Sequence, residues 1–142
     1  MIFDSWAGVL APSQFRRYVI EPARRIVAAL RERFPDVPVI GFPRMAGLSI
    51  EPYAHETGVS AVGLDTAMDL SRVVPLLPNA VAAQGNLDPL ALVAGGSTLA
   101  AETQAILAAM RGRPFIFNLG HGIVPQTPPE HVAALVEAVR AS

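Results

Sequence analysis

The feature that most constrains this chain is a repeated order of short apolar runs, each followed by a segment with helical periodicity. Short runs with few polar positions are typical of parallel strands buried on both faces. The runs lie at residues 1–3, 39–42, 61–64, 80–83 and 115–117. Helical patterns follow at residues 13–33, 50–57, 68–77, 97–110 and 129–140, with one more helix start at Asp88 and Pro89. This alternation predicts a parallel α/β architecture of about five strand–helix units.

The length leaves two architectures open. A closed barrel of eight strand–helix units typically needs about 250 residues, and the chain has 142. An open, doubly wound sheet of five strands fits this length, and so does a truncated barrel. In both cases the polar residues that follow the strands gather at one edge of the sheet. Within the first long helix, Pro22 is expected to cause a break or a kink.

Composition excludes several kinds of site and partner. Because the chain has no cysteine, it cannot form a disulfide scaffold or a thiolate site for metal or redox chemistry. Its formal charge is -1, without long runs of one sign, which argues against a nucleic-acid or anionic-membrane surface. The start lacks a signal-peptide pattern, and no apolar run approaches the roughly 18 residues of a membrane span. We therefore expect a cytoplasmic protein with no membrane partner.

Known catalytic motifs are absent as well. The sequence contains neither GxGxxG nor GxxxxGK[ST], the usual phosphate cradles of nucleotide sites. It also lacks HExxH and the GxSxG turn of acyl-transfer enzymes. The three histidines are scattered along the chain, which gives little support for a zinc site. We therefore expect a site without metal or cofactor, built from polar residues in loops.

Polar residues do follow each expected strand. They are Asp4, Ser5, Trp6, Arg44, Asp65, Gln84, Asn86, Asn118 and His121. Some have structural explanations: Asp4 and Ser5 are suited to capping a turn, and Asp65 and Asp88 are expected to be helix caps. Packing explains His121 least well, because the two glycines beside it let the backbone come close to another group.

Four segments carry a resemblance to a known family. They are residues 3–8 (FDSWAG), 63–65 (GLD), 84–89 (QGNLDP) and 118–122 (NLGHG). In this order and spacing they resemble the C-terminal part of the uroporphyrinogen decarboxylase family, and the match covers essentially the whole chain. The resemblance implies a partial (β/α)8 TIM barrel, about its last five βα units, formed by residues 1–142 as one C-terminal portion of a barrel domain.

The resemblance also implies an activity. The family converts uroporphyrinogen III to coproporphyrinogen III in haem biosynthesis, removing four acetate carboxylates as CO2 without metal or cofactor, and tends to form homodimers. By similarity, Phe3 and Ser5 would line the cleft, with Ser5 donating a hydrogen bond to substrate. His121 would contact a substrate carboxylate or assist proton transfer. Asp4 is a further candidate for substrate binding, and Arg44 is added from its position after a strand.

The sequence also departs from the family. The aspartate that binds the pyrrole NH groups, the arginine cluster for the carboxylates and a nearby tyrosine belong to the family's N-terminal part, which has no counterpart here. Met45 interrupts a region that is usually glycine-rich, and Thr66 stands where many relatives have tryptophan. We therefore expect a fragment, from a misassigned start or a split gene, with little decarboxylase activity alone.

Two other interpretations remain at this point. The chain could be a non-catalytic half-barrel that pairs with itself or with a separate N-terminal piece. It could also be a relative of the cobalamin-dependent methyltransferases, which share the barrel. Those relatives bind zinc with a cysteine among the ligands, and this chain has no cysteine.

Overall fold

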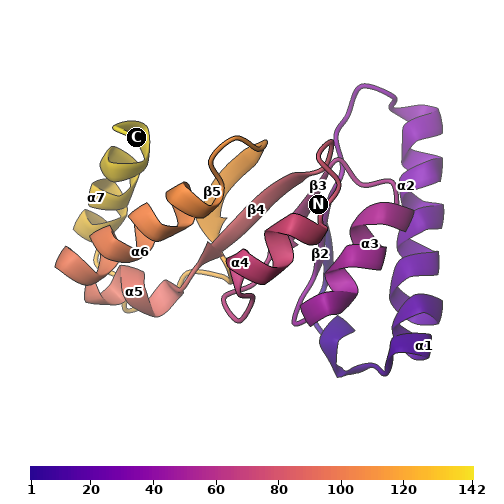
Figure 1. The fold of residues 1–142 in the computed structure, drawn as a ribbon, viewed down its shortest axis with the longest axis horizontal. Helices are drawn as coiled ribbons and strands as arrows, with labels where there is room; N and C mark the ends of the chain where they lie inside the picture. The colour runs from indigo at the N-terminus through magenta and orange to yellow at the C-terminus, as the bar shows by residue number, and fades with distance from the viewer.

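The computed structural model describes all of residues 1–142, which form one parallel sheet and its covering helices (Figure 1). The strands are β1 (Ile2–Asp4), β2 (Ile40–Pro43), β3 (Ala61–Leu64), β4 (Ala82–Leu87) and β5 (Phe115–Leu119). The helices are α1 (Pro12–Phe15), α2 (Glu21–Arg33), α3 (Ile50–Glu56), α4 (Leu70–Val73), α5 (Pro89–Ala94), α6 (Gly96–Ala109) and α7 (Pro129–Arg140), with 3-10 turns at Ala7–Val9, Gly47–Ser49 and Val74–Leu76. No helix combines the length and the apolar character needed to cross a bilayer.

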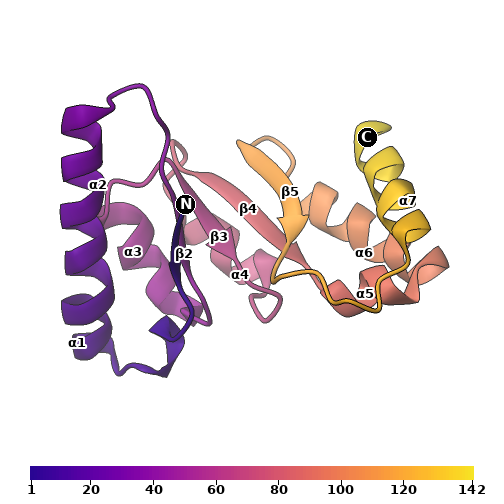
Figure 2. The same cartoon turned by 180° about the vertical axis from the view of Figure 1, so that it is seen from behind.

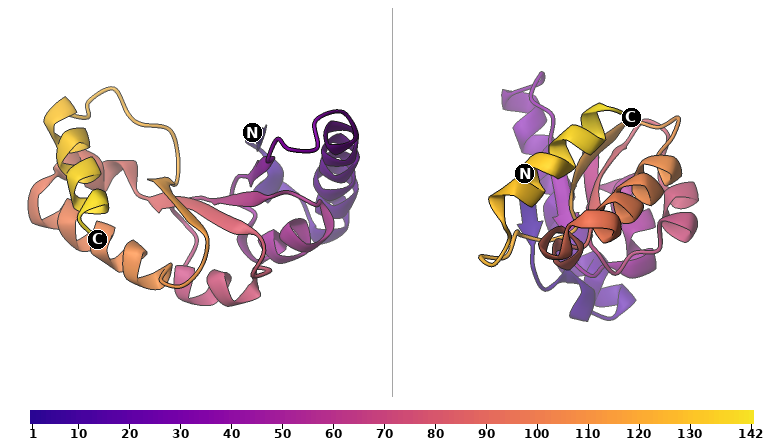
Figure 3. Two further views of the ribbon diagram at one scale, coloured as in Figure 1. Left: turned by 90° about the horizontal axis from the view of Figure 1, so that it is seen from above. Right: turned by 90° about the vertical axis from the view of Figure 1, so that its left-hand side faces the viewer.

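Strand order decides between the two architectures. The strands lie in the order β1-β2-β3-β4-β5, and all neighbours pair in parallel, as Figure 2 shows from behind. A doubly wound sheet instead reverses its order at a switch point and carries helices on both faces. Here the helices lie around one side of a curved sheet (Figure 3). The fold is therefore a partial (β/α)8 barrel, which confirms the predicted fold class.

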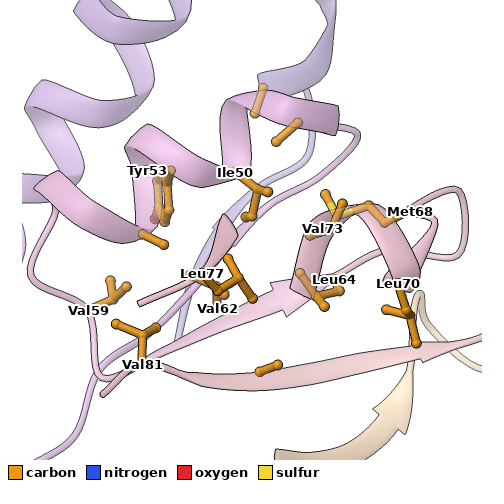
Figure 4. Close-up of a cluster of buried hydrophobic side chains, with 14 of the residues drawn as sticks. Ile50, Tyr53, Val59, Val62, Leu64, Met68, Leu70, Val73, Leu77 and Val81 are labelled. Atoms are coloured by element: carbon orange, nitrogen blue, oxygen red, sulfur yellow. The ribbon is translucent and has the colours of Figure 1, made fainter. Parts of the chain in front are cut away.

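The core fills the space between the sheet and the helices. Val62 and Leu64 of β3 are completely buried, and they meet Ile50 and Tyr53 of α3 and Val73 of α4 (Figure 4). The opposite face of the sheet is open. There Phe3 of β1 remains 68% exposed and Ile116 of β5 44% exposed. Each large apolar side chain buried on the helical side contributes roughly 1.5–3 kcal/mol, so the stability comes from that side.

Strand β4 differs from the sequence-based expectation. It begins later and runs longer than residues 80–83, so Gln84 and Asn86 lie inside the strand and not in a turn. Gly85 between them has φ +120°, and a Cβ there would stand 2.3 Å from the carbonyl oxygen of Leu64. Only glycine fits such a close approach. The QGN segment is therefore a bent strand pressed against β3.

A break or a kink had been expected at Pro22. The helix does not break there: the chain is helical from Pro12 to Arg33, with a π-helical turn, Arg16–Ile20, that ends two residues before the proline. In that turn the Glu21 backbone N–H donates to the carbonyl of Arg16, five residues back. The wider turn makes room for the ring, which otherwise clashes with the preceding turn of an α-helix.

Candidate functional site

A hollow of about 490 Å³ opens on the uncovered face of the sheet, at the carboxyl ends of the strands. Every strand or the loop after it contributes to its lining. The residues that bear on its chemistry are Phe3, Ser5, Phe42, Arg44, Gln84, Asn118 and His121. No acidic residue lines the hollow. Four of the five predicted site residues, Phe3, Ser5, Arg44 and His121, therefore meet at one place.

The floor of the hollow is aromatic. The rings of Phe3 and Phe42 pack edge to face, with centroids 6.0 Å apart and an interplanar angle of 84°. Phe42 was not expected in the site, although alternation along β2 places it on the same face as Ile40 and Arg44. Gln84 of β4 also faces the hollow, and the only hydrogen-bond partner of its side-chain amide is the weak acceptor Sδ of Met1, at 3.9 Å. The floor thus offers apolar ring faces and a nearly free amide.

Arg44 supplies a guanidinium to this apolar surface. The one ion pair of the chain joins Arg16 to Glu56 on the helical side, so Arg44 has no carboxylate partner. Its backbone is fixed on both sides: its N–H donates to the carbonyl of Asp4 and its own carbonyl accepts from the N–H of Gly8, each at 3.0 Å. An unpaired guanidinium on a rigid backbone is suited to bind a carboxylate in bidentate fashion.

His121 stands exposed at the edge of the hollow, in the loop after β5. Gly120 beside it is buried, and its N–H donates to the carbonyl of Leu87 at 2.8 Å. A Cβ on Gly120 would lie 2.4 Å from the backbone nitrogen of Thr66. The glycine thus lets the loop press against the segment after β3, as the sequence suggested, whereas a Cβ on Gly122 would extend into open space.

Asp4 lies apart from these residues. Since successive side chains of a strand point to opposite faces, Asp4 points away from the hollow that Phe3 lines. Its carboxylate accepts a hydrogen bond from the backbone N–H of Trp6 at 3.2 Å, and it lines a separate small hollow that includes Tyr53. The structure therefore does not support the expected role of Asp4 in substrate binding, and favours the turn-capping role.

Burial, with the nearby charge of Asp4 as the smaller cause, raises the pKa of Tyr53 to about 12. The folded chain therefore holds the phenol proton more tightly than the unfolded chain does. The free energy of unfolding should keep this contribution below about pH 10 and lose it as the pH rises toward 12. We expect Tyr53→Phe to remove that part of the alkaline decline in urea unfolding. Tyr18→Phe is the control, because Tyr18 is 56% exposed; equal declines in wild type and Tyr53→Phe would contradict the prediction.

Of the two predicted helix caps, Asp88 and Asp65, only Asp88 caps a helix. Asp88 does cap α5, accepting from the N–H of Leu90 at 2.8 Å. Asp65 does not cap a helix, because α4 begins later and is capped by Asp69, which accepts from Ser71 N–H at 2.9 Å. Asp65 instead accepts from the backbone of Met45 and of Ala67. No pattern in the sequence predicts the contact between Asp65 and Met45, which lie twenty residues apart.

Asn86 of β4 holds the turn after β3. Its Nδ2 donates to the carbonyl of Asp65 at 2.6 Å and to that of Met68 at 3.1 Å. No three His, Asp or Glu side chains lie close enough together to hold a metal ion.

The hollow offers the guanidinium of Arg44, the imidazole of His121 and the hydroxyl of Ser5 around its aromatic floor. The amides of Gln84 and Asn118 lie beside them. This arrangement can bind a polyanion with an apolar body.

Comparison with known proteins agrees with the motifs. The family model for uroporphyrinogen decarboxylase matches residues 1–142. The uroporphyrinogen decarboxylase of Granulibacter bethesdensis is 59% identical over 140 residues, 99% of this chain and 41% of the relative. That of Gluconacetobacter diazotrophicus is 57% identical over 140 residues, again 99% of this chain, and 40% of the relative. The chain thus spans about 40% of the length of the curated relatives that it matches.

A solved structure supports the fold independently. A methyltransferase from Methanosarcina mazei superposes with a TM-score of 0.77 over 97% of this chain and 40% of its own. Sequence identity is 20%, so this likeness concerns the arrangement of strands and helices only.

Proposed function

Because this chain belongs to the uroporphyrinogen decarboxylase family, we propose that it serves the decarboxylation of uroporphyrinogen III to coproporphyrinogen III. The reaction belongs to porphyrin biosynthesis and makes the protein a carboxy-lyase. The curated relatives that match 140 residues of this chain are named uroporphyrinogen decarboxylase. The assignment to the C-terminal portion of a barrel domain, the homodimer and the cytoplasmic location stay predictions.

The observation that carries the proposal is the unpaired Arg44 guanidinium in a hollow without acidic residues. Uroporphyrinogen is a large apolar macrocycle with carboxylates at its periphery. The aromatic floor of Phe3 and Phe42 suits the macrocycle, and Arg44 suits a peripheral carboxylate. A hollow of about 490 Å³ is in the range of sites that enclose part of such a ligand.

Decarboxylation of an acetate arm requires an electron sink. Protonation of the pyrrole carbon next to the one that bears the acetate arm first makes the ring an electron sink. When the bond between the acetate methylene and its carboxylate breaks, CO2 leaves and the electron pair moves toward the ring, forming a C=C bond between the methylene and the ring. Protonation of the methylene carbon then yields a methyl group, and loss of the proton from the pyrrole carbon restores the aromatic ring. A departing carboxylate held against the apolar floor loses hydration, which favours the transition state, where its charge is dispersed.

Two polar residues have roles in this scheme. His121 at the edge of the hollow binds a carboxylate or moves the proton. Ser5 donates a hydrogen bond to the substrate, and its hydroxyl has no partner within the chain that would compete. The hollow supplies one arginine, Arg44, for the eight carboxylates of the substrate. We therefore expect the chain alone to bind the tetrapyrrole more readily than it decarboxylates it.

Two measurements on the purified chain test the proposal. The first is fluorescence titration with uroporphyrin III, the air-stable oxidised form that keeps all eight carboxylates, and saturable binding is the expected result. The second is anaerobic incubation with uroporphyrinogen III, followed by chromatographic quantification of coproporphyrinogen. Absence of both binding and turnover, with self-association seen in sedimentation, would overturn the proposal and favour the non-catalytic half-barrel.

A further inference from the structure

Asp65 fastens three segments at the rim of the hollow. Its side chain lies just beyond β3, and the residue is 4% exposed. The Oδ2 atom accepts from the backbone N–H of Met45 at 2.7 Å, and Oδ1 accepts from Ala67 N–H at 2.9 Å. Its backbone carbonyl accepts from the Asn86 amide at 2.6 Å. A buried carboxylate persists where its oxygens are hydrogen-bonded in this way.

Met45 needs that hydrogen bond. It is the one residue other than glycine with a positive φ, 59°, a conformation that costs energy when a side chain is present. The N–H donated to a carboxylate is a strong, charge-assisted bond that compensates for this strain. A glycine at this position would adopt the same conformation without strain.

The course of the chain at Met45 determines where Arg44 points. On its other side Arg44 is already held by Asp4 and Gly8 through the backbone. Gly8 packs so closely on Met45 that a Cβ there would lie 2.1 Å from the Met45 carbonyl oxygen. Within the turn, the Ala46 N–H also donates to the carbonyl of Pro43 at 3.3 Å. The bond from the Met45 N–H to Asp65 is the side-chain hydrogen bond that ties this turn to the segment after β3.

We propose that Asp65 is a positioning residue that holds Arg44 toward the hollow, where it binds a carboxylate of the ligand. The inference rests on the proposed function, because it takes the ligand to be a tetrapyrrole polycarboxylate. Asp65 does not line the hollow and both its oxygens are occupied, so it is neither an acid nor a base in the reaction. Its effect on binding passes through Arg44.

A double-mutant cycle tests this dependence. Asp65→Asn keeps the size but offers a single acceptor oxygen, so one of the two N–H groups loses its partner. It should weaken uroporphyrin III binding about 3- to 10-fold, and have no further effect in the Arg44→Ala background. Asp69→Asn is the matched control, with the same change of charge on a carboxylate that caps α4, and should leave affinity unchanged.

Two further measurements separate positioning from general loss of structure. The Met45 amide should exchange faster with deuterium in Asp65→Asn, while core amides such as Val62 keep their protection. Met45→Gly added to Asp65→Asn should recover part of the affinity, because glycine adopts the left-handed turn without strain. If Asp65→Asn alone does not fold, this double variant is compared with Met45→Gly instead.

The outcomes distinguish the inference from the proposed function. Equal losses from Asp65→Asn with and without Arg44 would overturn the positioning role and leave the proposed function standing. Unchanged affinity in Arg44→Ala would overturn both the role of Arg44 and this inference. Failure of the unaltered chain to bind uroporphyrin III would contradict the proposed function, and Met45 amide exchange would still show whether Asp65 holds the turn.

Discussion

Arg44→Ala should weaken the binding of uroporphyrin III about 10- to 100-fold, the range expected for one charge-assisted hydrogen-bonding group. Arg44 brings a side-chain cation into a hollow without acidic residues, and no carboxylate of the chain competes for it. Removing it leaves a ligand carboxylate facing the aromatic floor without a partner. Fluorescence titration at low and high salt measures the effect, which should shrink as salt screens the pair.

Arg25→Ala is the control for this variant. Arg25 is exposed on α2, on the helical side of the sheet, so its loss changes the net charge equally without touching the hollow. We expect its affinity for uroporphyrin III to stay within experimental error of the unaltered chain. Equal weakening in the two variants would mean that overall charge, and not the position of Arg44, governs binding.

Leu64→Ala should lower the free energy of unfolding by about 2–5 kcal/mol. Leu64 is completely buried, and Figure 4 shows it among side chains of β3 and α4. Truncation removes apolar contacts and leaves a cavity that strands and helices on either side cannot easily close. Urea unfolding followed by circular dichroism measures the change in midpoint.

Leu90→Ala provides the comparison. Leu90 lies at the start of α5 and is 66% exposed, so the same truncation should change stability by less than about 0.5 kcal/mol. A small effect at Leu64, comparable to that at Leu90, would show that the helical side of the sheet is not packed as described.

Most of the fold followed from the sequence because the pattern is repetitive. Four of the five apolar runs lie at the observed strands β1, β2, β3 and β5, since buried parallel strands need continuous apolar residues. Strand β4 was misplaced at Gln84 and Asn86, whose composition is typical of turns. In the structure Gln84 pairs with Gly63 on one side and Ile116 on the other. Pairing with two neighbours overrides local preference.

The candidate site followed from the sequence in part. The positions after strands indicated Ser5, Arg44 and His121, because the ends of parallel strands converge. That Phe3 and Asp4 face opposite sides of the sheet could have been predicted from the sequence, since consecutive strand residues point to opposite faces. The role of Asp65 could not be predicted, because it depends on the left-handed turn at Met45. No local sequence pattern indicates a contact between segments twenty residues apart.

The rim of the hollow has a consequence for how this surface can change over generations. Its segments are tied by backbone groups: Gly8 to Arg44, Arg44 to Asp4, and Gly120 to Leu87. The hydroxyl of Ser5 and the imidazole of His121 take no part in these ties. Mutation can therefore exchange them without redirecting the loops that carry them. Substitutions at Ser5 and His121 can therefore change which anionic ligand the hollow binds. Substitutions at Gly8, Gly120 or Asp65 would instead disturb the loops themselves.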